Sequence, residues 1–238
     1  MNVNLKLILI FTYILCFGAL FTFLFSYLDF KDLTDFYYIK KNSEAFLEYR
    51  KNNLLLFTSL FLLISIFWIF FLGLGSPVAI ISGFVFGQWY GTLISTISLT
   101  VGSTLLYIFV RSYFHHLVLD HLEKKIKNYK NLFKKNELFY FTIFRLAGGA
   151  GIPFPIQNIL PIVFNMRIKN YFCASFFGLV PSLFIANTLG SGVEKMIGKN
   201  ESLSYIDIIF NPGIYWPIIG FIAILVASFF IREKFFKK

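Results

Sequence analysis

The chain has 238 residues, of which 57% are hydrophobic and only 14% are charged, and it contains 33 phenylalanines. A soluble domain averages about 45–50% apolar and about 25% charged residues, so this composition excludes an ordinary soluble protein and predicts an integral membrane protein. The net charge of +10 then concerns membrane orientation and anionic lipid, and we expect no nucleic-acid partner.

Apolar runs predict two membrane-spanning helices in the first part of the chain, at 7–28 and 54–74. A signal peptide is the alternative for the first run, which is however longer than the usual apolar core of such a peptide. The segment 29–51 between the two runs is polar and balanced in charge, and we expect it to lie on the surface.

The next apolar run, 78–110, is too long for one perpendicular crossing, which takes about 20 residues. Because Gly75-Ser76-Pro77 stops the preceding helix, we expect a hairpin arm at 77–90 and then a full span at 91–110. One long tilted helix is the alternative. Glycines four residues apart are expected on one helical face, where a second backbone can approach closely: Gly83, Gly87 and Gly91.

The long hydrophilic stretch at 111–138 has apolar residues at the spacing of an amphipathic helix, and six lysines lie between or just after them. A basic helix of this kind is expected on the cytoplasmic leaflet, where anionic headgroups attract it.

The histidines of this stretch have no carboxylate at ligand spacing, and Cys16 and Cys173 form no metal-binding pattern. The sequence therefore predicts no metal site, no disulfide framework and no cofactor.

The stretch FTIFRLAGGAGIPFPIQN at 141–158 combines an arginine, a glycine cluster and two prolines between strongly apolar flanks. Proline lacks an amide donor and restricts the residue before it, so no continuous helix tolerates this run. Broken backbone at membrane depth is tolerated only where protein buries it or a watery cavity solvates it. The stretch is therefore predicted to be a re-entrant element that lines a polar cavity, with Arg145 as its charged member.

A polar island at 165–170 precedes a predicted span at 171–189 that is kinked at Pro181. A polar loop at 191–211, a last span at 214–231 and a basic tail complete the chain. The excess of lysine and arginine places the lysine-rich middle stretch and the tail in the cytoplasm, and leaves the orientation of the N-terminus open.

The same plan occurs twice, because a Gly/Pro-broken apolar segment precedes a span rich in small residues at 75–90 and again at 148–161. Paired broken segments are typical of inverted-repeat transport proteins. We therefore expect an all-α polytopic helical bundle with two opposed re-entrant helical hairpins. Its expected parts are an N-terminal helix with a polar segment (1–53), a membrane domain (54–192), and a polar loop, last helix and basic tail (193–238).

Two blocks of this sequence resemble one known family. GFVFGQWYGTLISTISLTVGSTLLYIFVRSYF is similar to the GxxFGxxxG…G…R signature of the VTT-domain proteins, the DedA or SNARE-associated superfamily. FRLAGGAGIPFPIQN, with NYFCASFFGLVPSLFIANTLGSG after it, resembles that family's R-x-x-P-x-x-P-F-x-x-x-N block and the G-x-x-P helix that follows. The residues that carry the resemblance are Gly83, Phe86, Gly87, Gly91, Gly102, Arg111, Arg145, Pro153, Phe154, Asn158, Gly178 and Pro181.

This resemblance covers about 76–192 and implies two opposed re-entrant loops in a small helical bundle. It also implies a role in lipid movement: scrambling of phospholipids, as in eukaryotic relatives, or flipping of a polyprenyl-phosphate carrier or proton-linked homeostasis, as in bacterial ones. A bacterial inner (plasma) membrane is the location that it suggests.

Arg145 is the residue expected to carry function, because a guanidinium stays charged and is costly to strand in lipid. It is predicted to bind a phosphate bidentately, or alternatively to cap carbonyls of its own broken loop. Gln157 and Asn158 either complete a polar cavity or satisfy backbone freed by the prolines, and Arg111 is expected to snorkel to headgroups. The expected substrate-binding residues are Arg145, Gly148, Gly149, Gly151, Pro153, Phe154 and Asn158.

Neither broken segment contains an aspartate, a glutamate or a histidine. This weighs against a proton-coupled carrier and against an intramembrane enzyme, so no catalytic residue is expected. The sequence predicts passive translocation of a phospholipid or lipid phosphate, with anionic or phosphate-bearing membrane lipids as partners. Secondary transport of a small solute or ion and a non-transport assembly or lipid-sensing role are the alternatives.

Overall fold

The computed structural model describes residues 48–126 and 135–198, together with Phe133 and single residues within 12–22 and 215–226. In this described part the chain forms helices joined by turns and contains no β-strand, which confirms the predicted all-helical class. Apart from those single residues, the spans predicted at 7–28 and 214–231 lie outside the described residues. So do the polar segment before residue 48, the loop from 199 and the tail.

Three described helices are long and apolar enough to cross a membrane: α3 (Leu54–Leu72), α5 (Gln88–Tyr113) and α10 (Ile168–Gly198), the last over Ile168–Glu194. They confirm the spans predicted at 54–74, 91–110 and 171–189.

The polar loop predicted from 191 is wrong in its first part, because α10 continues through Pro181 and ends only at Gly198. Residues 191–198 contain no proline, so nothing there removes a helical hydrogen bond.

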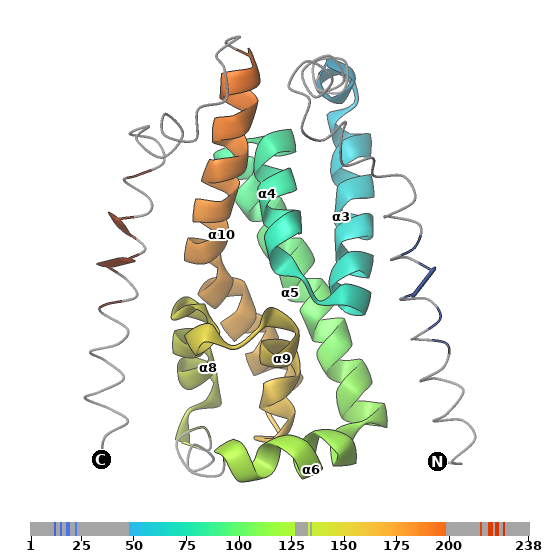
Figure 1. Cartoon of the computed structure of the whole chain (residues 1–238), viewed down its shortest axis with the longest axis vertical. Helices are drawn as coiled ribbons and strands as arrows, with labels where there is room; N and C mark the ends of the chain where they lie inside the picture. The colour runs from blue at the N-terminus through green and yellow to red at the C-terminus, as the bar shows by residue number, and fades with distance from the viewer. Residues whose placement is uncertain are drawn as a thin grey trace.

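The short helix α4 (Gly75–Phe86) is separated from α5 by Gly87, whose φ of 80° and ψ of 176° end one helix and begin the next. Figure 1 shows that α3 descends, α4 returns beside it and α5 then descends the length of the bundle. This confirms the predicted break and excludes one long tilted helix. The expected common face for Gly83, Gly87 and Gly91 is wrong, because Gly87 is the turning residue, in a conformation that glycine adopts without strain.

Small residues bring α4 and α10 into backbone contact. A Cβ on Gly83 would lie 2.1 Å from the backbone oxygen of Asn187, and a Cβ on Gly190 would lie 2.0 Å from that of Ile80. A Cβ on Gly91, at the start of α5, would lie 2.5 Å from Asn187 Oδ1. The close approach that small residues permit between membrane helices is therefore centred on Asn187.

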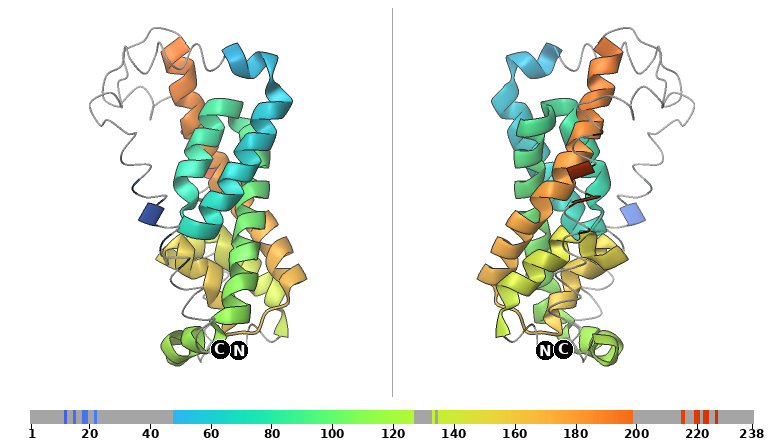
Figure 2. Two further views of the ribbon diagram at one scale, coloured as in Figure 1. Left: turned by 90° about the vertical axis from the view of Figure 1, so that its right-hand side faces the viewer. Right: turned by 90° about the vertical axis from the view of Figure 1, so that its left-hand side faces the viewer.

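A second helical hairpin is formed by α8 (Glu137–Leu146) and α9 (Phe154–Ile159), which are joined by η2 (Gly148–Gly151). Asn136 begins α8 by accepting a hydrogen bond from the amide of Phe139 at 3.1 Å. After α9, η3 (Leu160–Ile162) and a turn lead to α10. In Figures 1 and 2 this hairpin occupies the end of the bundle opposite to the one where α4 meets α5.

We call α3 and α4 the first hairpin, and the turn that joins them its tip. This tip meets the start of α9, next to the tip of the second hairpin, inside the bundle. A Cβ on Gly73, in the turn between α3 and α4, would lie 3.0 Å from Cβ of Pro155 in α9. A Cβ on Gly75 would lie 3.5 Å from the ring of Phe154. Around this meeting point α10 packs against α4, α5 and α8, so the point is surrounded by helices.

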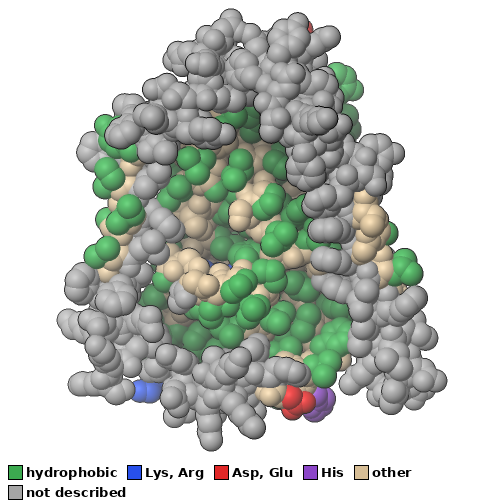
Figure 3. Space-filling view, viewed as in Figure 1, with side chains coloured by type: hydrophobic (Ala, Val, Ile, Leu, Met, Phe, Trp, Pro, Cys, Tyr) green, Lys and Arg blue, Asp and Glu red, His purple; other side chains and the backbone are tan. Residues whose placement is uncertain are grey.

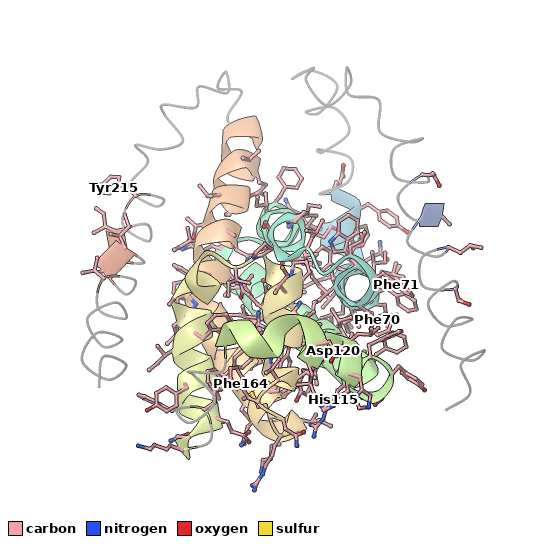
Figure 4. All side chains as sticks on the ribbon, turned by 60° about the horizontal axis from the view of Figure 1, so that its bottom comes forward. Phe70, Phe71, His115, Asp120, Phe164 and Tyr215 are labelled. Atoms are coloured by element: carbon pink, nitrogen blue, oxygen red, sulfur yellow. The ribbon has the colours of Figure 1, made fainter. Side chains whose placement is uncertain are left out.

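The helix α6 (His115–Ile126) crosses the end of the bundle beneath the second hairpin, and Figure 4 brings it forward with His115 and Asp120 labelled. It confirms a helix in the first part of the predicted basic stretch, while residues 127–132 and the lysine side chains of this helix lie outside the description. In Figure 3 the middle of the visible face is mainly hydrophobic, and charged side chains and a histidine stand at its lower edge.

Candidate functional site

Arg145 lies in the last turn of α8 and is only 1% exposed. Its Nη1 donates to Gln157 Oε1 at 3.2 Å, and its Nη2 donates to Asn158 Oδ1 at 2.7 Å and to the Tyr171 hydroxyl at 3.1 Å. We refer to Gln157, Asn158 and Tyr171 as the Arg145 cage. The cage brings together α8, α9 and the first turn of α10.

Aromatic rings cover the remaining surface of the guanidinium. Its central carbon lies 4.9 Å from the ring centroid of Phe141, 5.0 Å from that of Phe154 and 5.9 Å from that of Tyr171. Ring faces attract a cation most strongly where water is excluded, as it is here. Phe154 comes from the second hairpin and also contacts the first, so this ring links the guanidinium to both tips.

No carboxylate of the described residues is among the hydrogen-bond partners of Arg145, whose acceptors are two amides and a phenol. The guanidinium Nε and the Asn158 Nδ2 are buried and have no hydrogen-bond partner among the described residues. The alternative that Arg145 caps carbonyls of its own loop is not what the geometry shows, since all three of its acceptors are side-chain atoms. The site thus holds one positive charge that neutral groups surround.

Gln157 satisfies the broken backbone in place of Arg145. Its Nε2 donates to the carbonyl of Ile152 at 2.6 Å and to that of Gly148 at 3.3 Å, while its Oε1 accepts from Arg145. Gln157 therefore fills both roles that the sequence left open for it. The loop itself is built from glycines in the left-handed region, with φ of 64° at Gly148, 71° at Gly149 and 78° at Gly151.

Two adjacent glycines allow a paired test of this loop. Alanine at Gly148 or at Gly149 incurs the strain of a positive φ, about 1 kcal/mol. A Cβ on Gly148 meets nothing within 4 Å, whereas a Cβ on Gly149 would lie 2.0 Å from the Gln157 side chain. We expect Gly149→Ala to lower the thermal unfolding midpoint in detergent clearly more than Gly148→Ala, because Gln157 must leave Arg145 and Ile152. Equal midpoints would show that Gln157 does not hold the loop.

A cavity of about 210 Å³ opens where the two tips meet α10. One water needs at least about 10–15 Å³ of such a cavity, so several waters fit into it. Arg145, one amide side chain and two hydroxyl side chains contribute to its wall together with apolar side chains. The lining residues are Gly75, Ser76, Ala79, Leu99, Arg145, Gly148, Phe154, Gln157, Leu179, Ser182, Leu183 and Ala186.

Both flanks of the second hairpin are fixed at its base. Arg111, in the last turn of α5, donates to the carbonyl of Met166 at 2.8 Å and to Asn165 Oδ1 at 2.6 Å. Two acceptors of Arg111 therefore come from the turn before α10, while the contact with headgroups expected for this half-exposed residue stays a prediction. On the other flank Glu137 accepts from the amide of Arg167 and from Asn170 Nδ2, which ties α8 to the start of α10.

The remaining residues predicted from the family resemblance pack helices and lie outside the cavity wall. A Cβ on Gly178 would lie 2.5 Å from Cβ of Arg145, so this glycine lets α10 approach α8 closely at Arg145. Gly102 does the same between α5 and Ile69 of α3. Phe86 is buried in the core, and Pro181 lies inside α10.

Sequence reasoning missed two polar residues of the interior. Tyr171 is fully buried, accepts from Arg145 and is within hydrogen-bond distance of the carbonyls of Ser103 and Asn158. Asn187 is equally buried and donates to Ser95 Oγ at 2.9 Å. A tyrosine at the start of a span is typical of the membrane interface, so no signal in the sequence predicted that Tyr171 belongs to the cage.

A second hollow, of about 530 Å³, lies between α3 and α5 and carries no charge on its wall. Figure 4 labels Phe70 and Phe71, which come from the end of α3. A wall of this kind offers a phosphate no cation to bind. Its lining residues are Ile66, Phe67, Phe70, Phe71, Leu105, Ile108, Phe109, Ser112 and Tyr113.

These features define a helical membrane protein with a buried, uncompensated cation between two hairpins. The family model of the VTT domain matches residues 70–192, more than half of the chain, and this range contains α4, the second hairpin and the whole Arg145 cage. The chain therefore belongs to the VTT-domain family, which includes the DedA and SNARE-associated Golgi proteins. No solved structure matches the chain. The family comprises membrane proteins implicated in lipid and membrane homeostasis, and it is generally not a family of enzymes.

Proposed function

We propose that this protein moves phosphate-bearing lipids across a membrane without an energy source, with Arg145 engaging the headgroup phosphate. One observation supports this proposal above the others. Arg145 is 1% exposed, has only neutral hydrogen-bond partners and lines a cavity between two hairpin tips. A buried charge without a counterion is costly, so a site that keeps one suits a ligand that brings the opposite charge.

In this proposal α4 of the first hairpin and the whole second hairpin are re-entrant elements, and they enter from opposite faces of the membrane. The helix α8 has ten residues and rises about 15 Å, half of a hydrocarbon core of about 30 Å. Polar backbone and the cage would then give a headgroup polar partners near the bilayer midplane. We assign the protein to a bacterial plasma membrane, with α6 and the C-terminus on the cytoplasmic side, because of its basic middle stretch and tail.

The test is lipid movement in reconstituted liposomes that carry a fluorescent phospholipid in both leaflets. An added reductant quenches only the outer leaflet, so quenching beyond about half of the signal reports transbilayer movement. We expect fast movement with the wild type and a rate at least about tenfold lower with Arg145→Ala, because the charge-assisted contact to phosphate is lost. Arg167→Ala, which removes an exposed arginine at the same end of the bundle, is the matched control and should keep the wild-type rate.

The outcomes separate the alternatives. Equal rates for the wild type and Arg145→Ala would leave lipid movement in place and reduce Arg145 to a structural role. If folded wild-type protein moves no lipid above protein-free vesicles, the proposal fails. Uptake of a small anion into the same vesicles would then favour secondary transport, and its absence would favour an assembly or lipid-sensing role.

A further inference from the structure

The charge of the cavity is set by a single side chain. Its described lining residues come from α4, α5, α8, η2, α9 and α10, and Arg145 is the charged one among them. The cage adds Asn158 and Tyr171, both of which are neutral. Among the described residues, the wall and the cage therefore hold a single charge, which is positive.

A single buried positive charge discriminates between phosphates by their charge. A phosphodiester carries one negative charge and forms a neutral pair with Arg145. A phosphomonoester carries two above pH about 6, so one negative charge stays unpaired in a place that water reaches poorly. Leaving one charge uncompensated in an interior is strongly unfavourable.

The unused hydrogen-bond donors at the cage also suit a phosphodiester. Arg145 Nε and Asn158 Nδ2 are the two buried donor atoms of the cage that lack an acceptor. A phosphodiester has two non-bridging oxygens, both of which accept hydrogen bonds. Because buried donors are costly to leave unpaired, an anion with two acceptor atoms suits a cage with two unused donors.

From this charge count we infer that the cavity selects lipids whose phosphate carries one negative charge, and that it discriminates against dianionic phosphomonoester lipids. The inference rests on the proposed function and names its substrate class. It separates two kinds of substrate that the family resemblance left open, since ordinary phospholipids are diesters and a polyprenyl phosphate is a monoester.

The expected pH dependence comes from the phosphomonoester and not from titratable groups of the protein near the site. The phenols that face the site are those of Tyr171 in the cage and of Tyr107, which stacks on Tyr171 with centroids 4.4 Å apart. A phenol keeps its proton until about pH 10 in water, so neither changes charge in the range used below. His115, His116 and Glu137 lie near the end of the bundle where α6 crosses, and none of them lines the cavity.

The experiment compares two lipids with identical fluorescent acyl chains in the liposome assay: phosphatidylglycerol, a diester, and phosphatidate, a monoester. Rates are measured with the wild type at about pH 5 and about pH 8, where the monoester carries about one and about two charges. Rates from protein-free vesicles are subtracted at each pH. We expect phosphatidylglycerol to move equally fast at both pH values, and phosphatidate to match it at the lower pH and to be on the order of tenfold slower at the higher.

A charge-addition variant tests the cause. Ser76 is exposed and lines the cavity, so Ser76→Lys adds a second positive charge at a position with room for it. This variant should restore phosphatidate movement at the higher pH. Ser76→Gln, a long side chain without charge, is the matched control and should not restore it.

Each result decides the inference. Phosphatidate that moves as fast as phosphatidylglycerol at the higher pH would overturn it while leaving lipid translocation intact. Rescue by Ser76→Gln as well as by Ser76→Lys would also overturn it, because size and not charge would then be limiting. If neither lipid moves at either pH with folded protein, the proposed function fails and the inference fails with it.

Discussion

Replacing Asn158 by aspartate is expected to stabilise the folded protein and to abolish lipid translocation. Asn158 Oδ1 already accepts from Arg145 Nη2 at 2.7 Å, and Asn158 Nδ2 has no hydrogen-bond partner to lose. Aspartate has the same shape and supplies the missing counterion within the same contact. A hydrogen bond to a charged group contributes about 1.5–3 kcal/mol, so we expect a gain of roughly 2 kcal/mol.

The transport loss follows from the same charge. With aspartate beside it, Arg145 forms a neutral pair, and an entering phosphate meets a second anion. Thermal unfolding in detergent and the liposome assay measure the two effects, which have opposite signs. A misfolded variant would lose both stability and transport, so a gain in one with a loss of the other cannot come from damage to the fold.

Asn187→Asp is the matched control. Asn187 is as buried as Asn158, but its side chain contacts Ser95 Oγ and the carbonyl of Leu183, and no cation. A carboxylate there must stay unpaired or take up a proton, and we expect a loss of stability of several kcal/mol. Equal losses from both variants would show that the charge of Arg145 is already neutralised. Undiminished lipid movement with Asn158→Asp would show that this charge does not bind phosphate.

Adding one methyl group where α4 crosses α10 is expected to lower the stability of the fold strongly. A Cβ at Gly83 or at Gly190 would lie about 2 Å from a backbone oxygen of the opposite helix, at 2.1 Å and 2.0 Å respectively. Backbone cannot move aside as a flexible side chain can, so the helices themselves must separate. Overpacking costs about 1–3 kcal/mol and occasionally more, and we place Gly83→Ala and Gly190→Ala at the upper end of this range.

Thermal unfolding in detergent, followed by tryptophan fluorescence, measures this effect. Trp89 lies 4.9 Å from the ring of Phe184 on α10 and therefore reports on the separation of α5 from this helix. Gly18→Ala is the control, because a Cβ at Gly18 meets nothing within 4 Å and its helical backbone accepts alanine. If Gly190→Ala unfolds at the temperature of the control, then the two backbones are not in contact in the membrane-extracted protein.

Much of the fold could be predicted because membrane helices have clear sequence signals. Apolar length gave the spans that became α3, α5 and α10, and the Gly/Pro interruptions gave the second hairpin. The end of α10 was missed because polarity was taken for a loop, whereas a helix that leaves the apolar region can continue for several turns. The common glycine face was missed because the spacing alone does not reveal that Gly87 turns the chain.

The charged residue of the site could be predicted from the sequence, but only some of the residues that surround it could. An arginine within apolar sequence must be satisfied by something, so Arg145 and the amides close to it in sequence could be proposed together. Tyr171 belongs to the cage only because α10 packs against α8, a contact between elements that are distant along the chain. Likewise the acceptors of Arg111 come from the turn before α10, and no local pattern encodes that pairing.

The contact between the hairpin tips constrains how this sequence can diverge. Gly73 has a φ of 66°, and a Cβ there would lie 3.0 Å from Cβ of Pro155, so each of these positions limits the size of the other. Relatives that carry a larger residue at the first position are expected to carry a smaller one at the second. Two sites far apart in the gene should therefore change together during evolution, and a substitution tolerated in one lineage should be harmful when it is transplanted alone into another.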